Sequence, residues 1–193
     1  TTLRLWKNPP RLDRVDGRGR TLHPAAIESE LTSRMDPLLA LTDTGLKALG
    51  IEIMIAHTLQ AGAEQIAAIV TGKGTAAELR AQALRLLAGD QRGHPAFART
   101  LDVALAADAP APLHQAAMAL LLPEFPARLI SEARTVLQQR SLGEKQHALA
   151  LLAQAATPAA DAVIDEWAAR LVAGTGEPAL QLDVVEALQA RGP

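Results

Sequence analysis

Apolar residues recur along the chain in blocks that are spaced as on one face of a helix. The clearest block is Ala83-Leu84-Arg85-Leu86-Leu87, within the stretch from Glu78 to Leu87. Matching blocks begin at Gly50, Ala117, Ala148 and Val184. Successive blocks are thus 33, 34, 31 and 36 residues apart, a recurrence typical of stacked pairs of helices. The pattern predicts an α-solenoid.

Prolines and turn residues indicate where the first helices begin and end. A helix is expected from Ala25 to Met35, and Pro37 is expected to begin a new one. The next helix follows the turn at residues 42–45, where Asp43 or Thr44 would cap it.

The remaining pairs carry similar signals. A short helix with an Ile/Val stripe is expected to end at Gly72, and Thr75 with Glu78 has the spacing of a capping box for the helix after it. The later helices are expected to begin near Pro95, Leu113, Pro126 and Pro158, with turns at 108–112, 141–143 and 174–176.

Two further positions, both shortly before each apolar block, also repeat. Four residues before the block the chain has, in order, Leu46, Leu79, Leu113, Glu144 and Leu180. Because Glu144 interrupts this series at the shortest step, we expect a local shift of the helix start there. One residue later a polar, mostly basic ladder follows: Lys47, Arg80, His114, Lys145 and Gln181. Its members would either pair with the turn acids of neighbouring helical pairs or form a partner-facing row on the concave surface.

Composition agrees with an all-α fold. Alanine and leucine supply most of the 49% apolar content, and aromatic residues make up only 2%. Both dominant residues are strong helix formers, whereas β-branched residues are sparse and rarely alternate.

Charge and cysteine content narrow the function classes. The net charge of −2 leaves no electrostatic footprint for nucleic acid, and the arginine cluster at residues 11–20 is interleaved with Asp13 and Asp16. Without cysteine, the chain has no disulfide, thiolate metal site or covalent haem attachment of its own. No apolar run has the roughly 20 residues that span a bilayer, so no transmembrane segment is expected. Because the chain opens on Thr1, we expect a fragment or a processed part of a longer protein.

Residues 1–24 differ from the rest and are expected to form an extended lead-in. Asn8-Pro9-Pro10 prevents a helix there, and Trp6 is the natural anchor onto the first helices. Arg14 and Asp16 are further candidates for this docking. If Trp6 anchors the lead-in, Trp6→Ala should raise the protease sensitivity of residues 1–24, and unchanged sensitivity would count against docking.

No motif for catalysis, cofactor binding or metal binding emerges. None of the five histidines lies three or four residues from another, as a metal pair on one helix face requires. Gly72-Lys73-Gly74 lacks the first glycine and the Ser/Thr of a phosphate loop. Trp167 and Arg170 are spaced for a cation–π pair, although Trp167 also suits the core. We therefore predict no catalytic, cofactor or metal residues in this chain.

The length of the repeat, the paired helices and Leu79-Arg80-x-x-Ala83-Leu84-x-Leu86-Leu87 resemble HEAT-like repeats. That resemblance covers about residues 25–192. It implies an all-α chain: an α-solenoid of about five HEAT-like helical pairs over residues 25–193, after the lead-in of residues 1–24.

A narrower resemblance concerns the lead-in. Leu5-Trp6-Lys7-Asn8-Pro9-Pro10, Asp13-Arg14-Val15-Asp16-Gly17 and Arg20-Thr21-Leu22 resemble the entry to the HEAT-like section of large bacterial extracytoplasmic proteins. In those proteins a sugar-dehydrogenase-like β-propeller precedes the repeats and a c-type cytochrome module follows. This resemblance implies a redox enzyme whose middle section is a helical spacer in the periplasm or outside the cell. The chain has no Cys-x-x-Cys-His and no propeller motif, so only the spacer role carries over.

Three functions are compatible with these features. The first is a non-catalytic scaffold that positions neighbouring domains or subunits within a larger extracytoplasmic oxidoreductase. The second is a free-standing HEAT-like adaptor that binds a protein or peptide on its concave face. The third, an enzyme such as a HEAT-like DNA glycosylase or bilin lyase, fits least, because a glycosylase needs a basic groove and a catalytic carboxylate.

Overall fold

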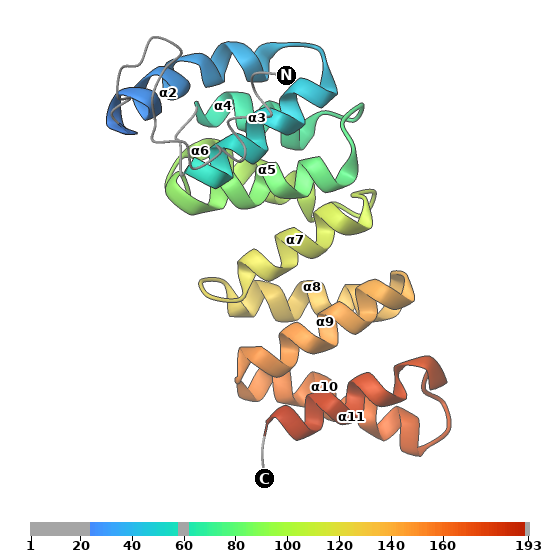
Figure 1. Ribbon diagram of the computed structural model, residues 1–193. Coiled ribbons are helices and arrows are strands. Elements are labelled where there is room, and N and C mark those ends of the chain that lie inside the picture. Colours follow the sequence, from blue (N-terminus) through green and yellow to red (C-terminus); the bar gives the residue numbers. More distant parts are fainter. Residues whose placement is uncertain (1–23, 58–61, 192–193) are drawn as a thin grey trace, which may run out of the picture. The chain divides into compact units, whose positions relative to one another are not determined.

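The computed structural model describes residues 24–57 and 62–191, which form ten α-helices, one 3₁₀ helix and no strand (Figure 1). The predicted all-α fold is confirmed for this part of the chain. The molecule divides into two compact units, Thr1–Val103 (unit 1) and Ala104–Pro193 (unit 2). The predicted lead-in lies outside the described residues except for Pro24, and one repeat domain over 25–193 stays a prediction.

Unit 1 is built from α2 (Pro24–Ala40), α3 (Thr44–His57), α4 (Ala63–Thr71), α5 (Ala77–Asp90) and nearly all of α6 (Pro95–Ala104). Helix α2 packs against α3 and α4, and α5 packs against α3 and α4. The core of unit 1 contains fully buried side chains from several helices: Met35, Ile51, Ile53, Met54, Ile66, Ile69, Leu84 and Leu87.

The expected break in the first helix is wrong, because α2 continues through Pro37. The carboxylate of Asp36 does not cap a new helix. It accepts a hydrogen bond of 2.8 Å from the backbone N–H of Gly62, the N-cap residue of α4. Pro37 has no backbone N–H, so the carbonyl of Ser33, four residues earlier, loses its helical donor. Ser33 is exposed, and water can donate to its carbonyl instead. The hydrogen bond from Gly62 to Asp36 therefore outweighs the helix start that Asp36-Pro37 indicates in the sequence.

The capping predictions have mixed outcomes. Asp43 caps α3, since its Oδ1 accepts from the backbone N–H of Leu46 at 3.0 Å. The capping box expected at Thr75 and Glu78 is wrong, because α5 begins at Ala77 with no side-chain cap. The backbone N–H of Thr75 instead donates to the carbonyl of Gly72 at 3.0 Å, so a turn uses this residue before the helix starts.

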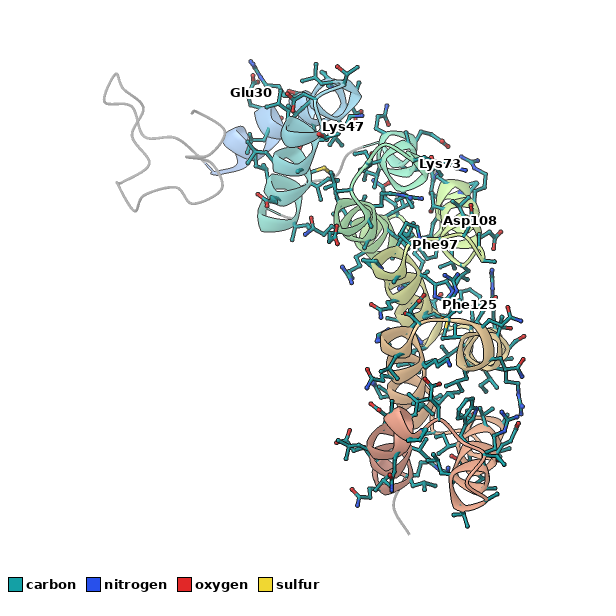
Figure 2. All side chains as sticks on the ribbon, turned by 90° about the vertical axis from the view of Figure 1, so that its right-hand side faces the viewer. Glu30, Lys47, Lys73, Phe97, Asp108 and Phe125 are labelled. Atoms are coloured by element: carbon teal, nitrogen blue, oxygen red, sulfur yellow. The ribbon has the colours of Figure 1, made fainter. Side chains whose placement is uncertain are left out.

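Unit 2 contains α7 (Ala111–Leu121), α8 (Pro126–Gln139), α9 (Leu142–Ala155), α10 (Pro158–Val172), the 3₁₀ helix η1 (Pro178–Leu180) and α11 (Gln181–Ala190). Helix α9 contacts both α7 and α11, while α8 contacts α10. The helices of this unit thus lie in two layers, with α7, α9 and α11 in one and α8 and α10 in the other (Figure 2).

The helix starts follow one register along the chain. Helices α3, α5, α7 and α9 each begin two residues before Leu46, Leu79, Leu113 and Glu144 respectively, and η1 begins two residues before Leu180. The shift expected at Glu144 is therefore wrong. Ser141 is the N-cap of α9 and keeps the start in place, so a glutamate occupies a position that is leucine elsewhere.

Two turns of unit 2 contain left-handed backbone. Ala156, which ends α9, has φ of 43°, and Gly174, after α10, has φ of 69°. Thr157 then caps α10 by accepting from the backbone N–H of Ala160 at 3.2 Å. Later in the same helix Trp167 is buried, and the Arg170 guanidinium lies 5.1 Å from its ring centroid, so both interpretations of this tryptophan apply.

Candidate functional site

The polar ladder predicted from the sequence forms the first position of an apolar stripe. Each ladder residue and the residues three, four and seven positions later share one helix face, which we call the inner stripe. In α5, α7 and α9 the nine apolar members are at most 1% exposed, and Ile51 and Met54 of α3 are buried to the same extent. The inner stripe of α9 consists of Lys145, Ala148, Leu149 and Leu152, and that of α11 of Gln181, Val184, Val185 and Leu188.

Arg80 is buried in unit 1, and its Nε–H donates to the carbonyl of Val70 at 2.6 Å. Val70 lies in the last turn of α4, where backbone carbonyls have no partner within the helix. The guanidinium therefore satisfies an end carbonyl and places a positive charge at the negative end of the helix dipole. Lys47, another ladder member, is half-buried in the first turn of α3 (Figure 2).

Glu144 is the centre of a buried polar cluster in unit 2. Both the hydroxyl and the backbone N–H of Ser141 donate to its Oε2, at 2.7 and 3.3 Å. Its Oε1 has no hydrogen bond but lies 3.4 Å from Nη1 of Arg140 and 3.7 Å from Nδ1 of His114. A carboxylate that is desolvated at this depth requires such neighbours.

Arg140 ties this cluster to the turn before α7. Its two terminal nitrogens donate to the carbonyls of Ala109 and Ala106, at 3.0 and 2.8 Å. One side chain from the end of α8 thus satisfies two turn carbonyls and faces the carboxylate of Glu144. The arrangement holds the turn, α8 and α9 together.

Two further contacts join α7 to the start of α9. The Nε2 atom of His147 lies 3.2 Å from the carbonyl oxygen of Gln115. The side-chain amide of Gln115 donates to the carbonyl of Gly143 at 3.3 Å.

Burial lowers the pKa of His114 below its usual value of 6.5, and the nearby positive charge of Arg140 lowers it further. The carboxylate of Glu144 acts in the opposite direction, and His147 adds a smaller lowering effect. The imidazole is therefore uncharged near neutral pH. His114 lines neither of the two grooves described below.

Lys145 connects α9 with the segment that leads into η1, because its Nζ donates to Oε2 of Glu177 at 2.6 Å. Beside it, the amide of Gln146 donates to Asp183 of α11 at 3.1 Å. Arg80, His114 and Lys145 thus make contacts inside their own unit, whereas Gln181 is exposed. Lys47 and Arg80 belong to unit 1, and His114, Lys145 and Gln181 belong to unit 2. The partner-facing row stays a prediction. Trp6, Arg14 and Asp16 lie outside the described residues.

The inner stripe of α11 differs from the others in exposure. Val185 is 41% exposed, Leu188 is half-buried, and Val184 alone is fully buried. The stripe forms one wall of a groove of about 370 Å³, whose other wall includes Leu171 and Val172 of α10. Val172 is 91% exposed. Gln181 has the one polar side chain in the lining, and the turn at Gly174 and Gly176 adds backbone groups. This groove is the best candidate for a functional surface in the described residues.

A second, smaller groove of about 250 Å³ lies between α9 and α11. Alanines form half of its lining, with Gln146, Gln154, Asp183 and Glu186 as the other half. Asp183 is already bonded to Gln146, so this groove has fewer free polar groups than its composition suggests.

Residues 24–57 and 62–191 contain neither a candidate metal site nor a candidate membrane-spanning helix. These residues contain no cluster of three or more His, Asp or Glu side chains that could hold a metal ion. Within the same ranges, no helix is both long and apolar enough to cross a bilayer.

The chain matches no protein-family model, and comparisons with curated proteins and with solved structures found no match.

Sequence reasoning did not predict the groove or the cluster around Glu144. The groove had no signal in the sequence, because Val185 and Leu188 stand at positions whose apolar residues are buried in the earlier blocks. The cluster had a signal, since Glu144 replaces leucine in a buried series. Arg140 had no such signal, because its partners are backbone carbonyls of a distant turn.

Proposed function

We propose that this chain is a non-catalytic helical scaffold that positions a protein partner, either a neighbouring domain or a subunit. In this proposal the helices form an α-solenoid of about five HEAT-like pairs. Following the resemblance of the lead-in, the parent protein is a larger extracytoplasmic oxidoreductase. The mechanism is positional, since the stacked helices set the distance and orientation between the parts they hold.

One observation carries this proposal: the inner stripe of α11 and the adjoining end of α10 form an apolar groove that no other described part of unit 2 covers. Val172 is 91% exposed and Val185 41%, although both are apolar and line one groove. Two exposed valines on the walls of one groove offer a partner an apolar surface to pack against.

A second candidate is a free-standing adaptor that binds a peptide along the layer of α7, α9 and α11. The groove between α9 and α11 favours it, because its carboxylates and amides give a peptide polar partners. No contact in the described residues favours the third possibility, an enzyme.

Site-specific photocrosslinking in the cells that make the protein tests the proposal. A photoreactive residue in place of Val172 should give a discrete crosslinked product with a domain or subunit of the native assembly. Gln138, an exposed residue of α8, is the matched control position. Equal, diffuse labelling from Val172 and Gln138 would overturn the proposal, whereas a discrete product from Gln154 alone would favour the adaptor.

A further inference from the structure

The turn before α7 and the first half of α7 are attached to one short segment, residues 140–147, at the end of α8 and the start of α9. Arg140 donates to two carbonyls of the turn. Two hydrogen-bonding contacts join Gln115 of α7 to the start of α9. His114 of α7 lies beside Glu144. The polar contacts of this part of α7 therefore depend on a single segment of the chain.

The charges in this cluster are balanced only while His114 is uncharged. Among the described groups whose charge acts on His114, Glu144 has the one carboxylate, and the others are Arg140 at the end of α8 and His147 in α9. A proton on His114 adds a second cation beside the carboxylate that already faces Arg140. His114 is 2% exposed and Glu144 5%, so water can do little to stabilise the added charge.

Arg140 and a charged His114 compete for one oxygen atom. Oε1 of Glu144 lies 3.4 Å from Nη1 of Arg140 and 3.7 Å from Nδ1 of His114. Its Oε2 already accepts from the hydroxyl of Ser141. If Arg140 moves away, the turn before α7 loses the donor to its two carbonyls. If His114 moves away, it takes the first half of α7 with it. Both movements loosen the same part of unit 2.

The rest of unit 2 has apolar packing that does not depend on this cluster. Helix α8 contacts α9 and α10 as well as α7, and α9 also contacts α10 and α11. The buried apolar face of α8 consists of Leu129, Ile130, Ala133, Val136 and Leu137. An opening confined to the first half of α7 leaves the contacts among α8, α9, α10 and α11 in place. Such local openings cost less free energy than unfolding of a whole unit.

We propose that the cluster around Glu144 is an acid-sensitive latch. In mildly acidic solution the turn before α7 and residues 111–115 separate from residues 140–147, while α8 to α11 stay folded. The opening reverses when the solution returns to neutral pH. This inference concerns a conformational change within unit 2 and does not depend on the scaffold function proposed above.

Amide hydrogen exchange of the 193-residue protein at about pH 7 and about pH 5 tests the latch, with the rates corrected for the intrinsic effect of pH. The protection of the amides of residues 114–117 should fall by at least about threefold more than that of the amides of α10, because the opening exposes α7 alone. Protection should return when the same sample is brought back to neutral pH.

Two variants identify the group that takes up the proton. His114→Gln should abolish the difference between α7 and α10, because an amide does not titrate in this range. His147→Gln is the matched variant, since His147 belongs to the same cluster and glutamine can still donate to the carbonyl of Gln115. In that variant the loss of protection in α7 should persist.

The wild-type protein provides a second measurement that needs no variant. The NMR signals of the His114 imidazole should shift over the same pH range in which α7 loses protection. This comparison decides the role of His114 even if His114→Gln does not fold.

Several results would overturn the latch. An equal loss of protection in α7 and α10 would mean that acid destabilises unit 2 as a whole, and no loss in α7 would mean that the cluster tolerates the proton. A loss that persists in His114→Gln, or one that disappears in His147→Gln, would assign the proton to another group.

Discussion

Nδ1 of His114 lies 3.7 Å from Oε1 of Glu144, and both side chains are almost completely buried. The two residues come from α7 and α9, and Glu144 stands at a position that is leucine in α3, α5, α7 and η1. The imidazole of His114 thus lies next to a carboxylate where those elements have an apolar side chain.

Acid should destabilise unit 2 through His114. Burial and Arg140 lower the pKa of His114 in the folded chain below the ordinary 6.5, so the unfolded chain binds this proton more readily. The stability from an uncharged His114 is fully present above about pH 6.5 and is lost as the pH falls from there through the lowered pKa of the folded chain. Urea unfolding followed by circular dichroism between neutral and mildly acidic pH should show this loss.

His114→Gln should make the loss of stability between about pH 7 and 5.5 shallower, because the titrating group is gone. His94→Asn is the comparison, since His94 is exposed and asparagine can keep the acceptor that caps the start of α6. An equal change of slope in both variants would assign the effect to some other group.

Glu144→Gln should lower the free energy of unfolding by about 1–3 kcal/mol, because it removes the negative charge that faces Arg140 in a buried place. The matched control is Glu132→Gln. Glu132 is half-exposed and lies 4.0 Å from Arg128, so its change should stay within about 0.5 kcal/mol. Equal losses in urea unfolding would show that burial of the carboxylate does not matter.

Arg80→Lys should cost about 1–3 kcal/mol although it keeps the charge. Lysine lacks the Nε–H that reaches the carbonyl of Val70, so a buried acceptor loses its partner. Arg85→Lys, at an exposed position further along α5, should change stability by less than about 0.5 kcal/mol. Thermal unfolding of the two variants would separate buried hydrogen bonding from helix propensity, which is similar for arginine and lysine.

Two glycines should respond to alanine in opposite directions. Gly89 lies inside α5, and a Cβ added there would meet open space, so Gly89→Ala should stabilise the protein by about 0.5–1 kcal/mol. Gly174 has φ of 69°, a conformation that alanine adopts with strain, so Gly174→Ala should destabilise by about 1 kcal/mol. A gain in melting temperature for both variants would contradict the left-handed turn after α10.

The helices could be predicted from the sequence because their signals are local. Proline starts at Pro95, Pro126 and Pro158 and the cap at Asp43 lie where expected. The errors occur where a contact between helices competes with a local signal. Asp36 bonds across to Gly62 instead of starting a helix.

The surface was harder to predict, since exposure depends on which helices are neighbours. Leu149 and Val185 are two apolar residues at one repeat position, yet Leu149 is fully buried and Val185 is exposed. Nothing in either residue type indicates this difference. It comes from the packing partners of α9 and α11, which are set by the tertiary fold.

The layered contacts of unit 2 have a consequence for how the chain can change over evolutionary time. Helices there pack against their nearest and next-nearest neighbours along the chain, as α9 does with α7 and α11. Because no single centre has to be preserved, the loss or duplication of a whole helical pair would disturb only the two faces that it joins. The number of helices in unit 2 could therefore change by a pair at a time while the remaining helices keep their packing.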